Sequence, residues 1–111
     1  MSVAANTRIF EETQNTRGPV PWVAETAIPN KHRELLGVAV SGVSRCGYCA
    51  LFHSASARLY GATDQEIAEA GYMGAVTMLA SSFMNAAELD YDRFRRETLD
   101  IVKHVRRHAH V

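Results

Sequence analysis

Apolar residues in the middle of the chain recur every three to four positions, which is the spacing of one face of a helix. The first such run follows Asn30, a residue type that often caps helices, and opens with the good helix formers of KHRELL. The later stretch VAVSGV is rich in β-branched residues and would also suit a strand. We favour a helix, whose apolar positions are Leu35, Leu36, Ala39, Val40 and Val43.

Two further helices are predicted between residues 46 and 88. The first covers about 46–60 and ends at Gly61, since glycine commonly follows a helix C-terminus. Thr63 and Glu66 then form a capping-box pattern that starts the second. Its apolar residues surround the axis, so we expect this helix to be buried on several sides, with Gly74 small enough for close helix approach. One stripe of apolar residues follows the helical repeat along it and comprises Tyr72, Val76, Leu79, Phe83 and Ala87.

The two ends of the chain differ from this central part. Asp90 or Asp92 can cap a last helix over about 91–108, which carries many charges between its apolar residues. All 3 prolines fall within residues 1–29, where GPVPWV cannot be a helix interior. We expect residues 1–17 to form an arm or a short helix, followed by an extended link. We therefore predict an all-α protein of about five helices and one domain over 1–111, with a core at 26–88 and an N-terminal arm at 1–25.

Composition limits the class of protein. A chain of 111 residues with 47% apolar and 22% charged residues has the size and composition of one globular domain, and no apolar window approaches the length of a membrane span. Twelve basic residues balance 12 acidic ones, so no charge-driven partner such as nucleic acid or an anionic membrane is indicated. The start MSVAANTRIF lacks the features of a secretory signal, so we expect a cytoplasmic protein.

The chemistry is concentrated at Cys46 and Cys49. In a reducing compartment, two cysteines three positions apart are more often redox-active or metal-binding than structural. If a helix begins at Cys46, then Cys49 and His53 share one of its faces. A helix N-terminus stabilises a thiolate, and an imidazole can accept a thiol proton. One cysteine would then attack and the other resolve the product as an intramolecular disulfide.

Glu34 is a candidate for orienting His53, as carboxylates do in other nucleophile and base arrangements. On one unbroken helix these two residues would lie about 28 Å apart. The chain must therefore reverse between them, and we expect the reversal between Gly42 and Arg45.

Four residues at these spacings, Glu34, Cys46, Cys49 and His53, resemble the signature of the alkylhydroperoxidase D-like branch of the carboxymuconolactone decarboxylase family. The flanking sequence is also similar, with Arg-Glu-Leu before the site and Gly-Ala-Thr and Glu-Ile after it. The resemblance covers roughly residues 26–88. It implies an all-α fold that assembles into trimers or hexamers and a thiol peroxidase that needs no metal, haem or other cofactor.

By the same resemblance, Cys49 attacks the hydroperoxide, Cys46 resolves, His53 is the base and Glu34 orients His53 through a water. An external dithiol, either a protein or a lipoyl group, would return the electrons. One position departs from the pattern: the best-known members carry a second histidine where this chain has Tyr48. A phenol titrates far above neutrality, so weak peroxidase activity is expected. The decarboxylase branch lacks the cysteine pair, which counts against decarboxylation.

Alternatives remain open at this stage. A thioredoxin-like fold would also use the cysteine pair, but it requires a downstream proline that this chain lacks. A structural zinc site could use both cysteines and His53, with Glu34 or His32 as the fourth ligand. A non-catalytic redox sensor or partner-binding module would use the same residues. His104 and His108 lie one helical turn apart, and we interpret them as part of a solvated basic C-terminal turn rather than as metal ligands.

Overall fold

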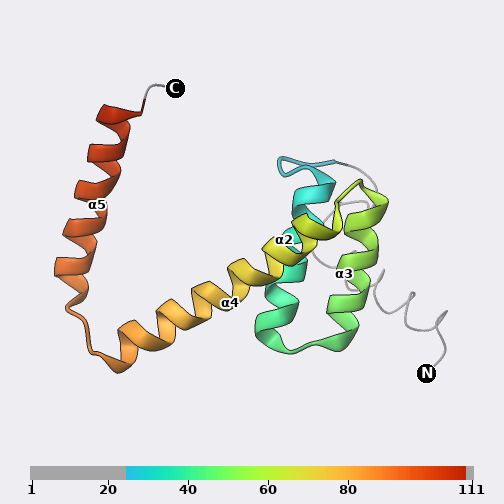
Figure 1. Ribbon diagram of the computed structural model, residues 1–111, viewed down its shortest axis with the longest axis horizontal. Helices are drawn as coiled ribbons and strands as arrows, with labels where there is room; N and C mark the ends of the chain where they lie inside the picture. Colours follow the sequence, from blue (N-terminus) through green and yellow to red (C-terminus); the bar gives the residue numbers. More distant parts are fainter. Residues whose placement is uncertain (1–24, 110–111) are drawn as a thin grey trace. The chain divides into compact units, whose positions relative to one another are not determined.

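The computed structural model describes residues 25–109, and these form four helices without a strand (Figure 1). The all-α prediction is therefore confirmed. The fifth predicted element belongs to the N-terminal arm, and residues 1–24 of that arm lie outside the described residues. The helices are α2 (Asn30–Ser44), α3 (Gly47–Leu59), α4 (Asp64–Ala86) and α5 (Tyr91–His108).

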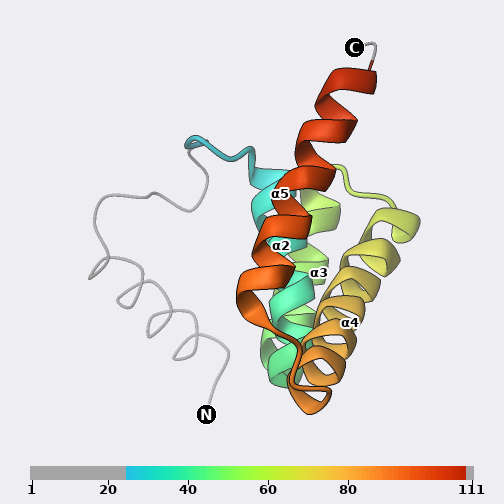
Figure 2. The same cartoon turned by 90° about the vertical axis from the view of Figure 1, so that its left-hand side faces the viewer.

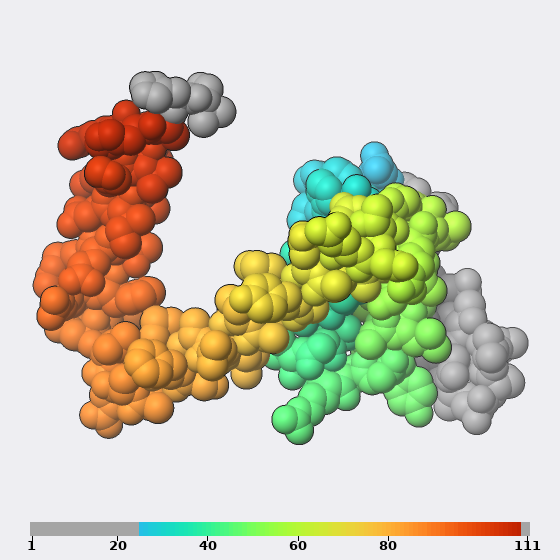
Figure 3. All heavy atoms as spheres, viewed as in Figure 1, coloured from blue at the N-terminus to red at the C-terminus, as the bar shows by residue number. Residues whose placement is uncertain are grey.

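The described chain divides into two compact units, at residues 25–75 and 76–109. The first unit contains α2, α3 and the first half of α4. In this unit α2 and α3 run side by side in opposite directions, as both ribbon views show (Figures 1 and 2). Figure 3 shows the atoms of residues 25–75 as one packed body. This helix pair carries all the predicted site residues.

Helix α2 confirms the helical interpretation of VAVSGV. Its buried residues fall one helical turn apart, so that one face of α2 lies against α3; they are Asn30, Glu34, Val38 and Ser41. Asn30 is the first residue of the helix and not its cap, which corrects the prediction. Pro29 occupies the cap position, because its φ of −54° already suits the start of a helix.

The reversal between α2 and α3 lies where the sequence predicts it. Arg45 ends α2 in the left-handed conformation, with φ 56° and ψ 39°. The backbone N–H of Cys46 then donates to the carbonyl of Ser41 at 3.0 Å, and that of Arg45 donates to Gly42 at 3.4 Å. This pair of bonds is the Schellman pattern of a helix C-terminus. It fixes the backbone of Cys46 directly to the end of α2.

The turn from α3 to α4 also follows the predicted signals. Gly61 has φ +90°, a conformation that glycine adopts without a steric penalty. The N–H of Glu66 donates to Thr63 Oγ1 at 3.1 Å, and the N–H of Thr63 donates to Glu66 Oε1 at 3.0 Å. The capping box is therefore confirmed. Lys31 pairs with Glu66 at 3.0 Å and so joins α2 to the first turn of α4.

Helix α4 differs from its prediction. Gly74 is its buried residue, and a Cβ there would lie 2.6 Å from the carbonyl oxygen of Ala39, so the backbones of α4 and α2 approach closely as expected. The expectation that α4 is buried on several sides is wrong for the single described chain. Tyr72 is 66% exposed and Phe83 67% exposed. The apolar stripe alone could not specify what would cover it.

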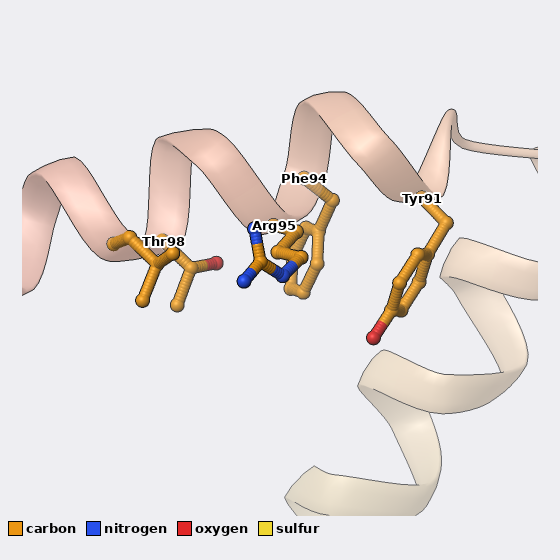
Figure 4. Close-up of a pocket in the computed structure, with 5 residues that line it drawn as sticks. Tyr91, Phe94, Arg95 and Thr98 are labelled. Atoms are coloured by element: carbon orange, nitrogen blue, oxygen red, sulfur yellow. The ribbon is translucent and has the colours of Figure 1, made fainter.

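Helix α5 begins where predicted, and Asp90 is its cap. The Asp90 carboxylate accepts the N–H groups of Asp92 at 2.9 Å and Arg93 at 3.3 Å. Tyr91 and Phe94 project from one side of α5 beside the Arg95 guanidinium and line a shallow hollow (Figure 4). No helix among residues 25–109 is both long enough and apolar enough to cross a membrane.

Candidate active site

The two cysteines lie at the N-terminus of α3, and both are free thiols. Cys46 is the N-cap residue, with extended backbone angles φ −97° and ψ 104°. Its Sγ accepts the backbone N–H of Cys49 at 3.2 Å. Cys46 is half-buried and Cys49 is exposed. A helix N-terminus leaves N–H groups without helical partners, so a thiolate at the cap position satisfies one of them.

This geometry shifts the pKa values of the two thiols in opposite directions. Hydrogen bonds from the Cys49 side chain and then from the Cys49 backbone N–H lower the pKa of the Cys46 thiol below its usual value. The side-chain hydrogen bond to Cys46 raises the pKa of the Cys49 thiol, and partial desolvation and the charge on Cys46 add to this. The Cys46 thiol therefore ionises more readily than the Cys49 thiol, and a nearby base would assist the ionisation of Cys49.

Glu34 and His53 meet across the α2–α3 contact. His53 Nδ1 donates to Glu34 Oε2 at 2.7 Å, and the Glu34 side chain is 8% exposed. The resemblance implied a bridging water, and the direct contact corrects that expectation. It arises because α2 and α3 are antiparallel neighbours, which brings together residues that are 19 positions apart in sequence.

The contact also fixes which ring nitrogen can act as a base. An ionised carboxylate only accepts hydrogen bonds, so we assign the proton to His53 Nδ1. In the neutral ring the lone pair is then on Nε2. Cys49 and His53 are four residues apart on α3 and therefore share a face of that helix. An imidazole with its lone pair on Nε2 thus lies one turn from the Cys49 thiol.

Gly37 is a further residue of this site that the sequence analysis missed. A Cβ at Gly37 would lie 2.5 Å from Cγ and 2.7 Å from Cδ2 of His53, and closer still to Nδ1. The imidazole therefore packs directly on the backbone of α2. Gly37 lies one turn after Glu34, and a glycine inside a helical pattern is the signal that could have identified it.

The remaining candidates are Tyr48 and two histidines of α5. Tyr48 is 87% exposed, beside the cysteines on the first turn of α3. The rings of His104 and His108 stack at 4.2 Å on α5, and His108 Nδ1 donates to the carbonyl of His104 at 2.8 Å. Over residues 25–109, no three His, Cys, Asp or Glu side chains converge in a way that would hold a metal ion. The zinc alternative, with His32 or Glu34 as its fourth ligand, therefore has no converging set of donors in the described chain.

Comparisons with known proteins agree with this fold. The profile of the carboxymuconolactone decarboxylase family matches residues 9–90. A crystal structure of a protein from Methanobacterium thermoautotrophicum, a structural genomics target, superimposes with a TM-score of 0.58 and 32% sequence identity. The match covers 74% of this chain and 89% of that one. The comparison with curated proteins gives no match. Since the profile covers most of its length, the chain belongs to the carboxymuconolactone decarboxylase family.

Proposed function

We propose that this protein is a thiol-dependent hydroperoxide reductase of the alkylhydroperoxidase D-like branch, which cycles a Cys46–Cys49 disulfide. The observation that carries the proposal is the direct hydrogen bond of 2.7 Å between His53 Nδ1 and the buried Glu34 carboxylate, one helical turn from Cys49. A carboxylate, an imidazole and a thiol in this order are the parts of an activated nucleophile.

The cycle begins with the proton of the Cys49 thiol. His53 Nε2 accepts that proton, and the Cys49 thiolate attacks one oxygen of the hydroperoxide ROOH. The O–O bond breaks, Cys49 becomes a sulfenic acid, and the departing RO⁻ takes the proton from the His53 imidazolium and leaves as ROH. Glu34 stabilises the imidazolium that forms, because its carboxylate already holds the other ring nitrogen. A base of this kind contributes about 10²- to 10⁴-fold to a rate.

The second step closes the disulfide. The Cys46 thiolate attacks Sγ of Cys49, the S–O bond breaks, and the hydroxide released takes a proton to leave as water. The backbone N–H of Cys49 reaches Cys46 Sγ at 3.2 Å, so the two residues already lie within one turn of each other. An external dithiol then reduces the disulfide. No cofactor takes part in this scheme.

Assembly into a homo-oligomer, a trimer or hexamer by the resemblance, is part of the same proposal. The support is the exposure of large apolar side chains on α4, notably Tyr72, Leu79 and Phe83. Such stripes on soluble proteins are typical of interaction surfaces. The proposed partner is a second copy of the chain.

Two single substitutions test the peroxidase cycle. Cys49→Ser should abolish turnover of an alkyl hydroperoxide with a dithiol reductant, because the attacking sulfur is lost. Cys46→Ser should still consume one equivalent of peroxide and stop at a sulfenic acid, which a dimedone adduct detected by mass spectrometry would report. The same assay separates a peroxidase from a redox sensor, which would form the disulfide once without multiple turnovers.

The matched control is Ser44→Ala, since Ser44 lies just before the turn and its hydroxyl donates to the nearby Ser41 carbonyl. This variant should turn over like the wild-type protein. Full activity in both cysteine variants would refute the proposed cycle. Stoichiometric zinc in the purified protein with unreactive thiols would favour a structural site instead.

A further inference from the structure

The two ends of the Cys46–Cys49 disulfide are not equivalent. One sulfur belongs to the N-cap of α3 and is half-buried, whereas the other belongs to the first turn and is exposed. A thiol that reduces a disulfide must attack one sulfur and expel the other as a thiolate. The rate therefore depends on access to the attacked sulfur and on the stability of the departing thiolate.

We propose that the external reductant attacks Sγ of Cys49 and expels Cys46 as a thiolate, so that the reductant is held as a mixed disulfide on Cys49. The inference rests on the proposed Cys46–Cys49 disulfide cycle and assigns the two sulfurs their roles in its reductive half.

The geometry at Cys46 supports its role as leaving group. When the S–S bond breaks, negative charge develops on Cys46 Sγ, which accepts the backbone N–H of Cys49 at 3.2 Å in the reduced protein. The 13 residues of α3 add the positive end of the helix dipole at the same place. In the reduced protein the Cys49 side chain and then the Cys49 backbone N–H lower the pKa of the Cys46 thiol. That N–H is still available when Cys49 Sγ is bonded to the reductant, and a thiol of lower pKa leaves faster.

Attack of the reductant on Sγ of Cys46 would be slower for two reasons. Cys46 is half-buried, and its backbone is fixed to the end of α2 by the bond of 3.0 Å to the Ser41 carbonyl. Cys49 would then have to leave as the thiolate, and it does not occupy the N-cap position, where the side chain of Cys46 accepts a backbone N–H. Access and leaving-group stability therefore favour the same sulfur for attack.

The reaction balances as follows. A thiolate of the reductant bonds to Cys49 Sγ, the S–S bond to Cys46 breaks, and its electron pair stays on Cys46. A second thiolate on the same reductant then attacks the reductant's own sulfur, and Cys49 leaves and takes a proton. The dithiol ends as a disulfide and both protein cysteines are reduced.

This order selects the chemical class of the reductant. After the first step, the Cys46 thiolate lies beside the mixed disulfide and can attack Cys49 to expel the reductant again. A monothiol has no tethered group to compete with that return. A dithiol with both sulfurs on a short chain completes the reduction intramolecularly. We therefore expect the reductant to be a dithiol whose two sulfurs lie close together on one chain.

The position of the mixed disulfide can be measured directly. The full chain is oxidised with diamide, which forms the disulfide without any peroxide chemistry, and is then treated briefly with 2-mercaptoethanol and quenched in acid. The free thiol is alkylated with N-ethylmaleimide. Trypsin cleaves after Arg45 and Arg58 and gives residues 46–58 as one peptide, and fragmentation between the two cysteines locates each label.

We expect the mercaptoethanol adduct on Cys49 and the maleimide on Cys46, in about tenfold or greater excess over the reverse labelling. The matched control is the same oxidised chain in denaturant, where α3 and its N-cap are lost and labelling should approach an even distribution. Even labelling in the folded protein, or an excess on Cys46, would overturn the inference.

The outcomes separate this inference from the proposed function. An adduct on Cys49 in a protein that does not turn over hydroperoxide would leave the inference intact and remove the peroxidase assignment. Turnover of hydroperoxide together with an adduct on Cys46 would support the peroxidase assignment and overturn the inference. A chain that diamide does not oxidise to the internal disulfide, shown by its unchanged intact mass, would overturn both.

Discussion

The placement of His53 on the backbone of α2 makes Gly37→Ala the most informative single substitution. The new Cβ would lie 2.5 Å from Cγ of His53, whereas an ordinary contact of this kind is 3.4–4 Å. The ring must therefore move by about 1 Å or rotate away. Its Nδ1 now lies 2.7 Å from Glu34 Oε2, and a displacement of that size lengthens this bond beyond hydrogen-bonding range.

The consequences for stability and for activity differ in size. Overpacking of this kind costs about 1–3 kcal/mol, while alanine in place of a helical glycine contributes about 1 kcal/mol. The free energy of unfolding should therefore fall by only about 0–2 kcal/mol. Turnover depends on a positioned base, so we expect it to fall by roughly 100-fold.

The control is Gly42→Ala on the same helix, where a new Cβ would have no atom of residues 25–109 within 4 Å. This variant should keep full turnover and unfold at equal or higher denaturant concentration. Peroxide turnover, chemical unfolding and the ring ¹⁵N shifts of His53 are measured for both variants. Unchanged ring shifts and full turnover in Gly37→Ala would refute the claim that His53 packs on the backbone of α2 because residue 37 has no side chain.

Four further results are expected. His53→Ala should move the pH profile for alkylation of Cys49 to higher pH, because the base is lost, and an unchanged profile would remove that role. Cys46 should be alkylated at lower pH than Cys49, because the pKa of the Cys46 thiol is lowered and its thiolate persists as the pH falls. Mass spectrometry of peptide 46–58 reports the order of alkylation. The reverse order would contradict the argument that the N-cap position stabilises the Cys46 thiolate. Asp90→Ala should lower the free energy of unfolding by about 1 kcal/mol, because two N–H groups of α5 lose their acceptor, and an unchanged unfolding curve would show that the cap is dispensable. Phe83→Asp should reduce the native mass in sedimentation, because the exposed apolar stripe of α4 would no longer pair with a second copy, whereas an unaltered native mass would place the interface elsewhere.

Local signals in the sequence were sufficient wherever the determining contacts are close along the chain. The capping box at Thr63 and Glu66, the left-handed Gly61 and the cap at Asp90 each involve residues within three or four positions. Asn30 was the exception, since Pro29 took the cap position in its place. The pairing of Cys46 with Cys49 is equally local. These features depend on backbone geometry within one turn, which a short sequence window contains.

The sequence by itself therefore determined the helical class, the positions of α2 to α5 and the candidate residues of the site. Tertiary structure alone decided how those residues meet. The direct bond between Glu34 and His53 spans 19 positions, and the role of Gly37 exists only because α3 places an imidazole against it. The opposite pKa shifts of the two thiols likewise depend on which sulfur occupies the cap. Periodicity specifies which face of a helix is buried, but the partner of that face and its atomic contacts follow from packing in three dimensions.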